Sequence, residues 1–118
     1  MRVLFVLTFL TALILPSGQA PASPPSDISA EVLHKQAARG NAWAQHNLGV
    51  LYDNGRGVPQ DYVKAYMWLD LAAAQLTSIG KKLAVNNRDD AARRMTPTQI
   101  TEAQRLSQQC QARQFKGC

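Results

Sequence analysis

The chain has 118 residues, of which 46% are hydrophobic and 18% charged, with a net charge of +5. This length supports one small domain, whose core gives only marginal stability without additional constraints such as disulfides. The two histidines, His34 and His46, fall in different segments with no cysteine or carboxylate cluster beside them, and no Ser-His-Asp or paired-carboxylate arrangement can be argued. We therefore expect no metal, no cofactor and no catalytic residues.

The N-terminus has the pattern of a secretory signal peptide. A basic residue precedes an apolar stretch, residues 3–15, that a proline and a glycine then break. The stretch is too short to span a bilayer comfortably. Cleavage after Ala20 or after Ala22 would remove it, so we expect residues 1–22 to be absent from a periplasmic or secreted mature protein. The alternative is a buried N-terminal helix.

Residues 23–27 are rich in proline and serine, a composition typical of a disordered linker. They leave residues 28–118 for the folded domain.

Charge is unevenly distributed along that domain. From residue 81 onward the chain carries eight basic and three acidic side chains. In an exported protein this excess favours an anionic envelope partner over nucleic acid. The alternative is a solvated helix carrying ion pairs between residues four apart. Asp89 could then pair with Arg93, and Asp90 with Arg94.

Apolar residues recur at helical spacing through most of the domain, and no stretch alternates for long enough to make a sheet. Asp27 or Ser29 can cap a first helix that Gly40 ends. Asn41 can cap a second helix that runs to about Asn54.

Gly49 lies inside the second predicted helix, where glycine costs about 0.5–1 kcal/mol relative to alanine. We expect another backbone to come close to this residue.

A loop with two glycines and a proline follows. Gly55 can end the second helix in the left-handed conformation, and Gly57 can supply a second unusual backbone angle. Val58 is expected to anchor the loop, and Asp61 can cap a third helix over residues 62–75. The spacing fits neither a phosphate loop nor a calcium loop. The loop is therefore expected to reverse the chain between the two helices rather than bind a ligand.

The second helix, the loop and the third helix together carry a dense pattern of small, aromatic and glycine residues. Its positions are Ala44, Leu48, Gly49, Tyr52, Gly55, Gly57, Val58, Asp61, Ala65, Trp68 and Ala72. Residues 41–76 thereby resemble one full repeat of the Sel-one-like repeat family, a relative of the tetratricopeptide repeats. The resemblance implies an all-α fold of about five helices, with antiparallel pairs in a short right-handed superhelix that serves as a scaffold for protein partners.

A single helix pair cannot bury its own apolar face. We expect a capping helix before the repeat and a degenerate helix pair after it, over residues 80–113. Gly80 indicates a connection before this pair, Ala84 and Ala91 mark its first helix, and the segment Thr96-Pro97-Thr98-Gln99 forms a capping box for its second.

Cys110 and Cys118 are separated by seven residues, and export would place them in an oxidising compartment. We predict a disulfide that contributes roughly 2–3 kcal/mol in the chain-entropy model. In cysteine-rich bacterial members of the family, similarly spaced cysteines tie one repeat to the next.

A rival hypothesis rests on Ser78 and Lys81, which fit the S-x-x-K pattern of penicillin-recognising enzymes. No S-D-N or K-T-G element follows. The expected function is instead that of a non-enzymatic scaffold for a protein or peptide in the cell envelope, with partner and oligomeric state left open.

The candidate partner-binding residues are Trp43, Asn47, Val50 and Asn54, which form a stripe on the second helix away from the repeat positions. In helix-pair repeats the first helix of each pair lines the concave surface. We predict that Trp43 is the main binding residue. The alternative is that it packs on the first helix.

Overall fold

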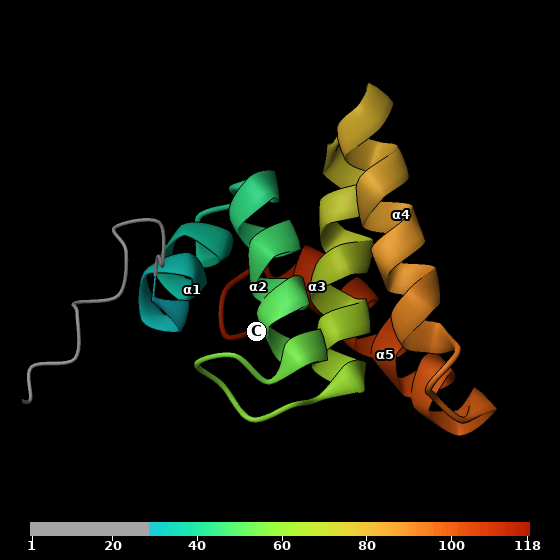
Figure 1. Ribbon diagram of the computed structural model, residues 1–118. Helices are drawn as coiled ribbons and strands as arrows, with labels where there is room; N and C mark the ends of the chain where they lie inside the picture. Colours follow the sequence, from blue (N-terminus) through green and yellow to red (C-terminus); the bar gives the residue numbers. More distant parts are fainter. Residues whose placement is uncertain (1–28) are drawn as a thin grey trace, which may run out of the picture.

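The computed structural model describes residues 29–118, which form five α-helices and no strand. The predicted signal peptide and linker lie outside these residues. The helices are α1 (Ala30–Ala38), α2 (Ala42–Asn54), α3 (Tyr62–Gln75), α4 (Ser78–Ala92) and α5 (Pro97–Ala112) (Figure 1). The predicted all-α fold of five helices is confirmed.

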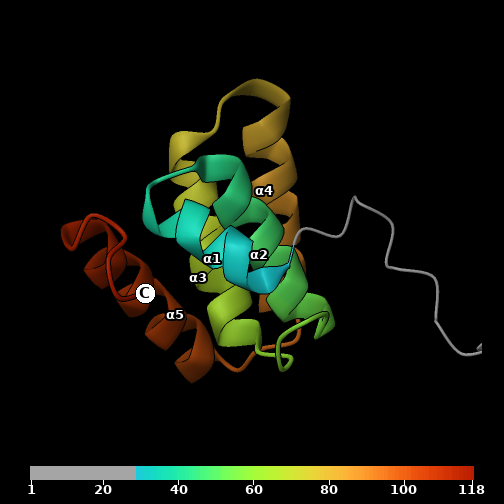
Figure 2. The same cartoon turned by 90° about the vertical axis from the view of Figure 1, so that its left-hand side faces the viewer.

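Helix α3 is the centre of the arrangement. It packs against α2, α4 and α5, while α1 packs against α2. Eight of its fourteen residues are buried, as a helix with neighbours on three sides requires. Each of the first three helices thus packs against the next, whereas α5 returns to α3 and lies on the opposite side of it from α4 (Figure 2).

Four of the five helices begin at a polar residue whose side chain accepts a hydrogen bond from the backbone N–H three residues later. These residues are Ser29, Asn41, Asp61 and Thr96. The side chain of Gln99 also accepts from the backbone N–H of Thr96 at 2.9 Å, which completes the predicted capping box. Of the two residues predicted as possible caps of the first helix, Ser29 caps α1. Asp27 lies outside the described residues.

The close approach expected at Gly49 is present. A Cβ atom there would lie 3.1 Å from the carbonyl oxygen of Ala65 and 2.7 Å from Cγ of Leu69. Both belong to α3, so the absent side chain sets how closely the two helices of the pair approach each other.

The loop between α2 and α3 turns the chain as predicted. Gly55 and Gly57 have φ angles of 64° and 73°, in the left-handed region that favours glycine. Val58 is half-buried and packs against the core. The backbone N–H of Asp61 donates to the carbonyl of Tyr52 at 2.9 Å, which closes the loop onto the end of α2.

The start of α4 differs from the prediction. Gly80 was expected in a connection but lies in the first turn of α4, where it is buried. A Cβ at this position would meet Cζ2 of Trp43 at 3.1 Å. Packing of the indole on the bare backbone therefore overrides the low helix propensity of glycine.

The ion pairs of α4 also differ from those predicted. Arg93 pairs with Asp90, three residues earlier rather than four. Arg94, which follows α4, does not pair with Asp90 but reaches Asp53 of α2 at 3.4 Å. This arginine faces the neighbouring helix, so the segment is not simply a solvated face.

The predicted disulfide is present. It joins Cys110, in the last turn of α5, to Cys118, with 5.7 Å between the two Cα atoms. The segment between them turns back from the helix, and the ring of Phe115 reaches Gly40 at the end of α1, where a Cβ would lie 3.4 Å from it. Residues 113–118, which we call the C-terminal tail, thus cover part of the core beside α1.

Candidate partner-binding surface

A groove separates α2 from α4. One part of it is a half-open pocket of about 300 Å³ lined by Val50, Asp53 and Asn54 of α2, Leu69 of α3, Asn87 and Asp90 of α4, and Arg94, which follows α4. We call this region, together with the exposed residues at its end near the start of α4, the α2–α4 groove. Two residues of the predicted stripe, Val50 and Asn54, are therefore part of its wall.

Exposed apolar side chains gather at the end of the groove near the start of α4. Trp43 is 50% exposed, Leu83 41% and Ile79 82%. The indole of Trp43 rests on Gly80 and stands edge-on to the imidazole of His46, with 5.7 Å between ring centroids. Trp43 is thus held in place by α4 while half of its surface stays open to solvent.

His46 connects two amide side chains across the groove. Asn87 of α4 donates its amide N–H to Nε2 of His46 at 3.0 Å, so Nε2 is the accepting nitrogen. Nδ1 then carries the proton and donates to Oδ1 of Asn47 at 3.2 Å. His46 itself is 5% exposed. These bonds leave the amide N–H groups of Asn47 and the carbonyl oxygen of Asn87 available for other partners.

The far end of the groove is charged. Arg94 pairs with Asp53 across it, and its guanidinium lies 5.7 Å from the ring centroid of Tyr62. The groove therefore grades from apolar at Trp43, through neutral amides, to an ion pair.

The predicted stripe accounts for residues on the α2 side of this groove only. All four residues of the stripe lie on α2, with Asn47 and Asn54 exposed and Val50 partly exposed. The α4 half, with Leu83 and Asn87, was missed. The residues of α4 at the groove recur at intervals of three and four, a spacing that indicates one helix face. No residue nearby in the sequence indicates that this face lies toward α2.

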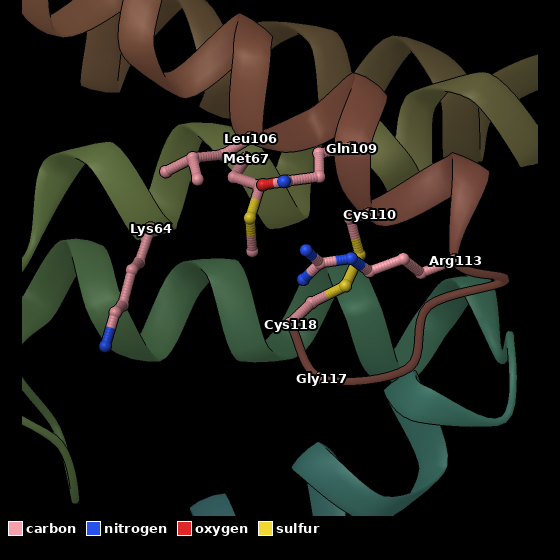
Figure 3. A pocket seen from close by; sticks show the side chains of 8 residues that line it. All are labelled: Lys64, Met67, Leu106, Gln109, Cys110, Arg113, Gly117 and Cys118. Atoms are coloured by element: carbon pink, nitrogen blue, oxygen red, sulfur yellow. A yellow bond between two sulfur atoms is a disulfide. The ribbon is translucent and has the colours of Figure 1, made fainter.

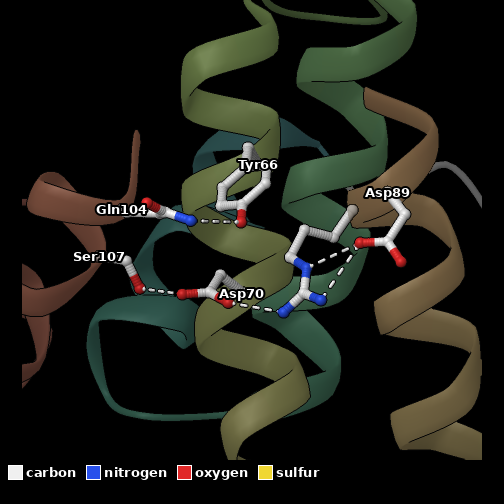
Figure 4. A network of polar contacts seen from close by, with 6 residues as sticks. Tyr66, Asp70, Asp89, Gln104 and Ser107 are labelled. Atoms are coloured by element: carbon white, nitrogen blue, oxygen red, sulfur yellow. Dashed lines mark hydrogen bonds and ion pairs between the residues drawn. The ribbon is translucent and has the colours of Figure 1, made fainter. Parts of the chain in front are cut away.

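A second polar group holds α5 in place (Figure 4). Asp70 of α3 accepts hydrogen bonds from Arg88 of α4 at 2.9 Å and from Ser107 of α5 at 2.7 Å. Gln104 of α5 donates to the hydroxyl of Tyr66 at 3.3 Å. The carboxylate of Asp70 thus joins three helices, and its role is structural.

His34 occupies the junction of α1, α2 and α3. Its Nε2 lies 2.9 Å from the hydroxyl of Tyr52, and its ring stands edge-on to Trp68. Burial, and secondly the positive charge of Lys64, lower the pKa of this imidazole below its ordinary value.

The two residues of the S-x-x-K pattern lie at the start of α4. Ser78 is the first residue of the helix, with a φ of 51°, and Lys81 follows within the first turn. Both are exposed.

Residues 29–118 contain neither a candidate metal site nor a membrane-spanning helix. No group of three or more His, Cys, Asp or Glu side chains there could hold a metal ion. None of the five helices is both long enough and apolar enough to cross a membrane.

Antiparallel helices joined by a glycine loop and packed in sequence define a helical-repeat protein. Residues 44–75 match the family model of the Sel1 repeat, so the chain contains one Sel1 repeat, as the resemblance implied. The match covers most of α2, the glycine loop and all of α3. Sel1 repeat domains typically act as protein-interaction scaffolds. No curated protein and no solved structure matches the chain.

Proposed function

We propose that this protein is an exported scaffold of the cell envelope that binds a protein or peptide partner in the α2–α4 groove. The observation that carries the proposal is the half-exposed Trp43, held on Gly80 at one end of the groove. Tryptophan is enriched among the residues that dominate binding energy at interfaces.

The middle of the groove suits a peptide backbone. Asn47 offers donors and Asn87 offers an acceptor, and both are held by His46. A peptide bond presents one carbonyl and one N–H, so it could bond to both amides at once. An extended segment with an apolar side chain against Trp43 and Leu83 would use the apolar and amide parts of the groove together.

Two observations support export. The disulfide between Cys110 and Cys118 is of the kind that persists in oxidising compartments. The first 22 residues have the signal-peptide pattern described above. Intact-mass measurement of the exported form should show a start at Pro21 or Ser23, and full-length chain in the cytosol would contradict this part of the proposal.

The test is a crosslinking pull-down from the native envelope with a photo-reactive residue in place of Asn54, which is exposed in the groove. The partner captured this way should be lost when Trp43→Ala is added. The matched control is Val32→Ala, which removes an apolar side chain of similar exposure, 43%, from α1. Equal loss in both variants, or capture unaffected by Trp43→Ala, would contradict binding in the groove.

The rival function is an enzyme that acts on cell-wall-like material with Ser78 as nucleophile and Lys81 as its base. A labelled β-lactam tests it directly. Covalent labelling that disappears in Ser78→Ala would establish the enzyme, whereas we expect no labelling of the native protein.

A further inference from the structure

A second pocket lies away from the α2–α4 groove, where α5 packs on α3. It is half-open, has a volume of about 180 Å³, and is lined by residues of α3, α5 and the C-terminal tail (Figure 3). This volume is well below the roughly 300–1,000 Å³ of pockets that hold drug-sized ligands. The pocket therefore has room for a single side chain or a short organic molecule.

The floor of this pocket is apolar and rich in sulfur. Met67 and Cys110 are buried, at 4% and 2% exposed, and Leu106 is half-buried beside them. The disulfide to Cys118 forms part of the wall. Sulfur is polarizable, and the flexible thioether of methionine adapts to apolar groups of different shapes.

The mouth of the pocket is positively charged. The side chain of Arg113 extends from the tail across the pocket, between Met67 and Cys118 (Figure 3). Among residues 29–118, no carboxylate of Asp or Glu lies within 4 Å of its guanidinium. No side chain that lines the pocket is acidic, and the other cation of its wall, Lys64, points away toward Tyr52.

We propose that this pocket binds an apolar monocarboxylate. Its carboxylate would take the bidentate hydrogen bonds that a guanidinium donates in one plane. Its apolar body would lie on Met67, Leu106 and the disulfide. The amide of Gln109, at the same pocket, can donate a further hydrogen bond. The ligand that supplies this carboxylate is either a free short-chain acid or the C-terminus of a peptide that ends in an apolar residue. Both present a carboxylate next to an apolar group.

Hexanoate is a suitable probe, read through methyl groups of labelled methionine. Met67 lines the pocket, whereas Met95 follows α4 and serves as an internal reference. Titration with hexanoate should shift the Met67 resonance and leave that of Met95 in place. Shifts of equal size at both, or none at Met67, would overturn the proposal, as would equal binding of hexanol, which lacks the carboxylate.

The matched variants are Arg113→Gln and Lys116→Gln. Both remove one positive charge from the tail, but only Arg113 lines the pocket. Arg113→Gln should weaken hexanoate binding about tenfold or more, because hydrogen bonds between charged groups contribute at least that factor. Lys116→Gln should change it less than about twofold, consistent with screening of a charge without direct contact. Equal weakening in both would show a general charge effect and overturn the site.

A peptide arm identifies the source of the carboxylate. Acetyl-Gly-Leu with a free C-terminus is compared with its C-terminal amide at the same Met67 resonance. Tighter binding of the free peptide than of hexanoate would support a peptide C-terminus, and weaker binding would support a free acid. Equal binding of the amide and the free peptide would overturn the proposal. Neither result depends on the α2–α4 groove, so it leaves the proposed function untouched.

Discussion

Cζ2 of Trp43 lies 3.1 Å from the point where Gly80 would carry a Cβ atom. This contact joins the start of α2 to the first turn of α4 and fixes the apolar end of the groove. Because the indole is half-exposed, it is supported on one side and available to a partner on the other.

The two tryptophans should respond differently to truncation. Trp68 is 1% exposed in the core, so Trp68→Ala should cost about 3–5 kcal/mol of unfolding free energy. Trp43 buries only about half of its surface, so Trp43→Ala should cost about half as much or less. Urea titrations followed by circular dichroism measure both. A loss for Trp43→Ala as large as that for Trp68→Ala would make it a core residue and refute its binding role.

Two glycine-to-alanine changes form a second matched pair. At Gly49 the new methyl would meet the backbone carbonyl of Ala65 and the buried Leu69, which cannot move easily. We expect Gly49→Ala to destabilise the protein by about 1–3 kcal/mol. At Gly80 the obstacle is the half-exposed ring of Trp43, which has room to shift toward solvent, and helix propensity improves by about 0.5–1 kcal/mol, so Gly80→Ala should be nearly neutral. The reverse order of stabilities would count against this packing.

The hydrogen bond between Ser107 and Asp70 should carry much of the docking of α5. Ser107→Ala should cost about 1–2 kcal/mol, because a hydroxyl that donates to a carboxylate is lost from a buried position. Asp70→Asn weakens the same bond and the pair with Arg88. A double-mutant cycle should give a coupling energy of at least about 0.5 kcal/mol. Additive effects would show that the two side chains do not stabilise each other.

The protonation of His34 should make stability depend on pH. Its pKa in the folded protein lies below the ordinary value of 6.5, so as the pH falls below 6.5 the unfolded chain takes up the proton first. The unfolding free energy should therefore be highest above pH 6.5 and decrease as the pH falls toward the lower, folded pKa. Denaturant titrations between about pH 7.5 and pH 5.5 test this, above the range of ordinary carboxylates.

His34→Gln should flatten this dependence, because glutamine does not titrate. Lys64→Gln should reduce it, because the charge of Lys64 is the second cause of the shift. An unchanged slope in His34→Gln would assign the effect to another group.

Reduction of the disulfide should lower the unfolding free energy by roughly 2–3 kcal/mol, because the unfolded chain regains the freedom of the closed loop. The tail should loosen before the rest of the domain, since the loop is local. Hydrogen exchange should therefore accelerate first in residues 113–118 and at the end of α5. Free thiols in freshly isolated protein would contradict the bridge.

The local features of the fold were predictable from the sequence. The caps, the two left-handed glycines of the loop and the limits of α3 depend on residues within three or four positions of each other. Gly55 and Asp61, for example, specify the end of one helix and the start of the next by backbone angle and side-chain acceptor alone. The tight approach at Gly49 was also predictable, because a glycine inside a helix needs a compensating contact.

The features that were missed depend on residues far apart in the sequence. The start of α4 rests on the contact between Gly80 and Trp43, and the return of α5 to α3 on the bond between Ser107 and Asp70. His46 reaches Asn87 in the same way, although the two residues are 41 positions apart. Side chains of these types are common on solvated helix faces, so periodicity alone does not identify which of them meet.

The contact between Phe115 and Gly40 bears on the order in which the chain can fold during synthesis. Helix α1 has nine residues, too few for a helix that is stable alone in water. Its support comes from α2, from Trp68 of α3 against His34, and from the tail, where Phe115 reaches Gly40 just after the helix. The ribosome makes α1 first among the described helices and the tail last. Helix α1 should therefore lack part of its support until the tail has been made.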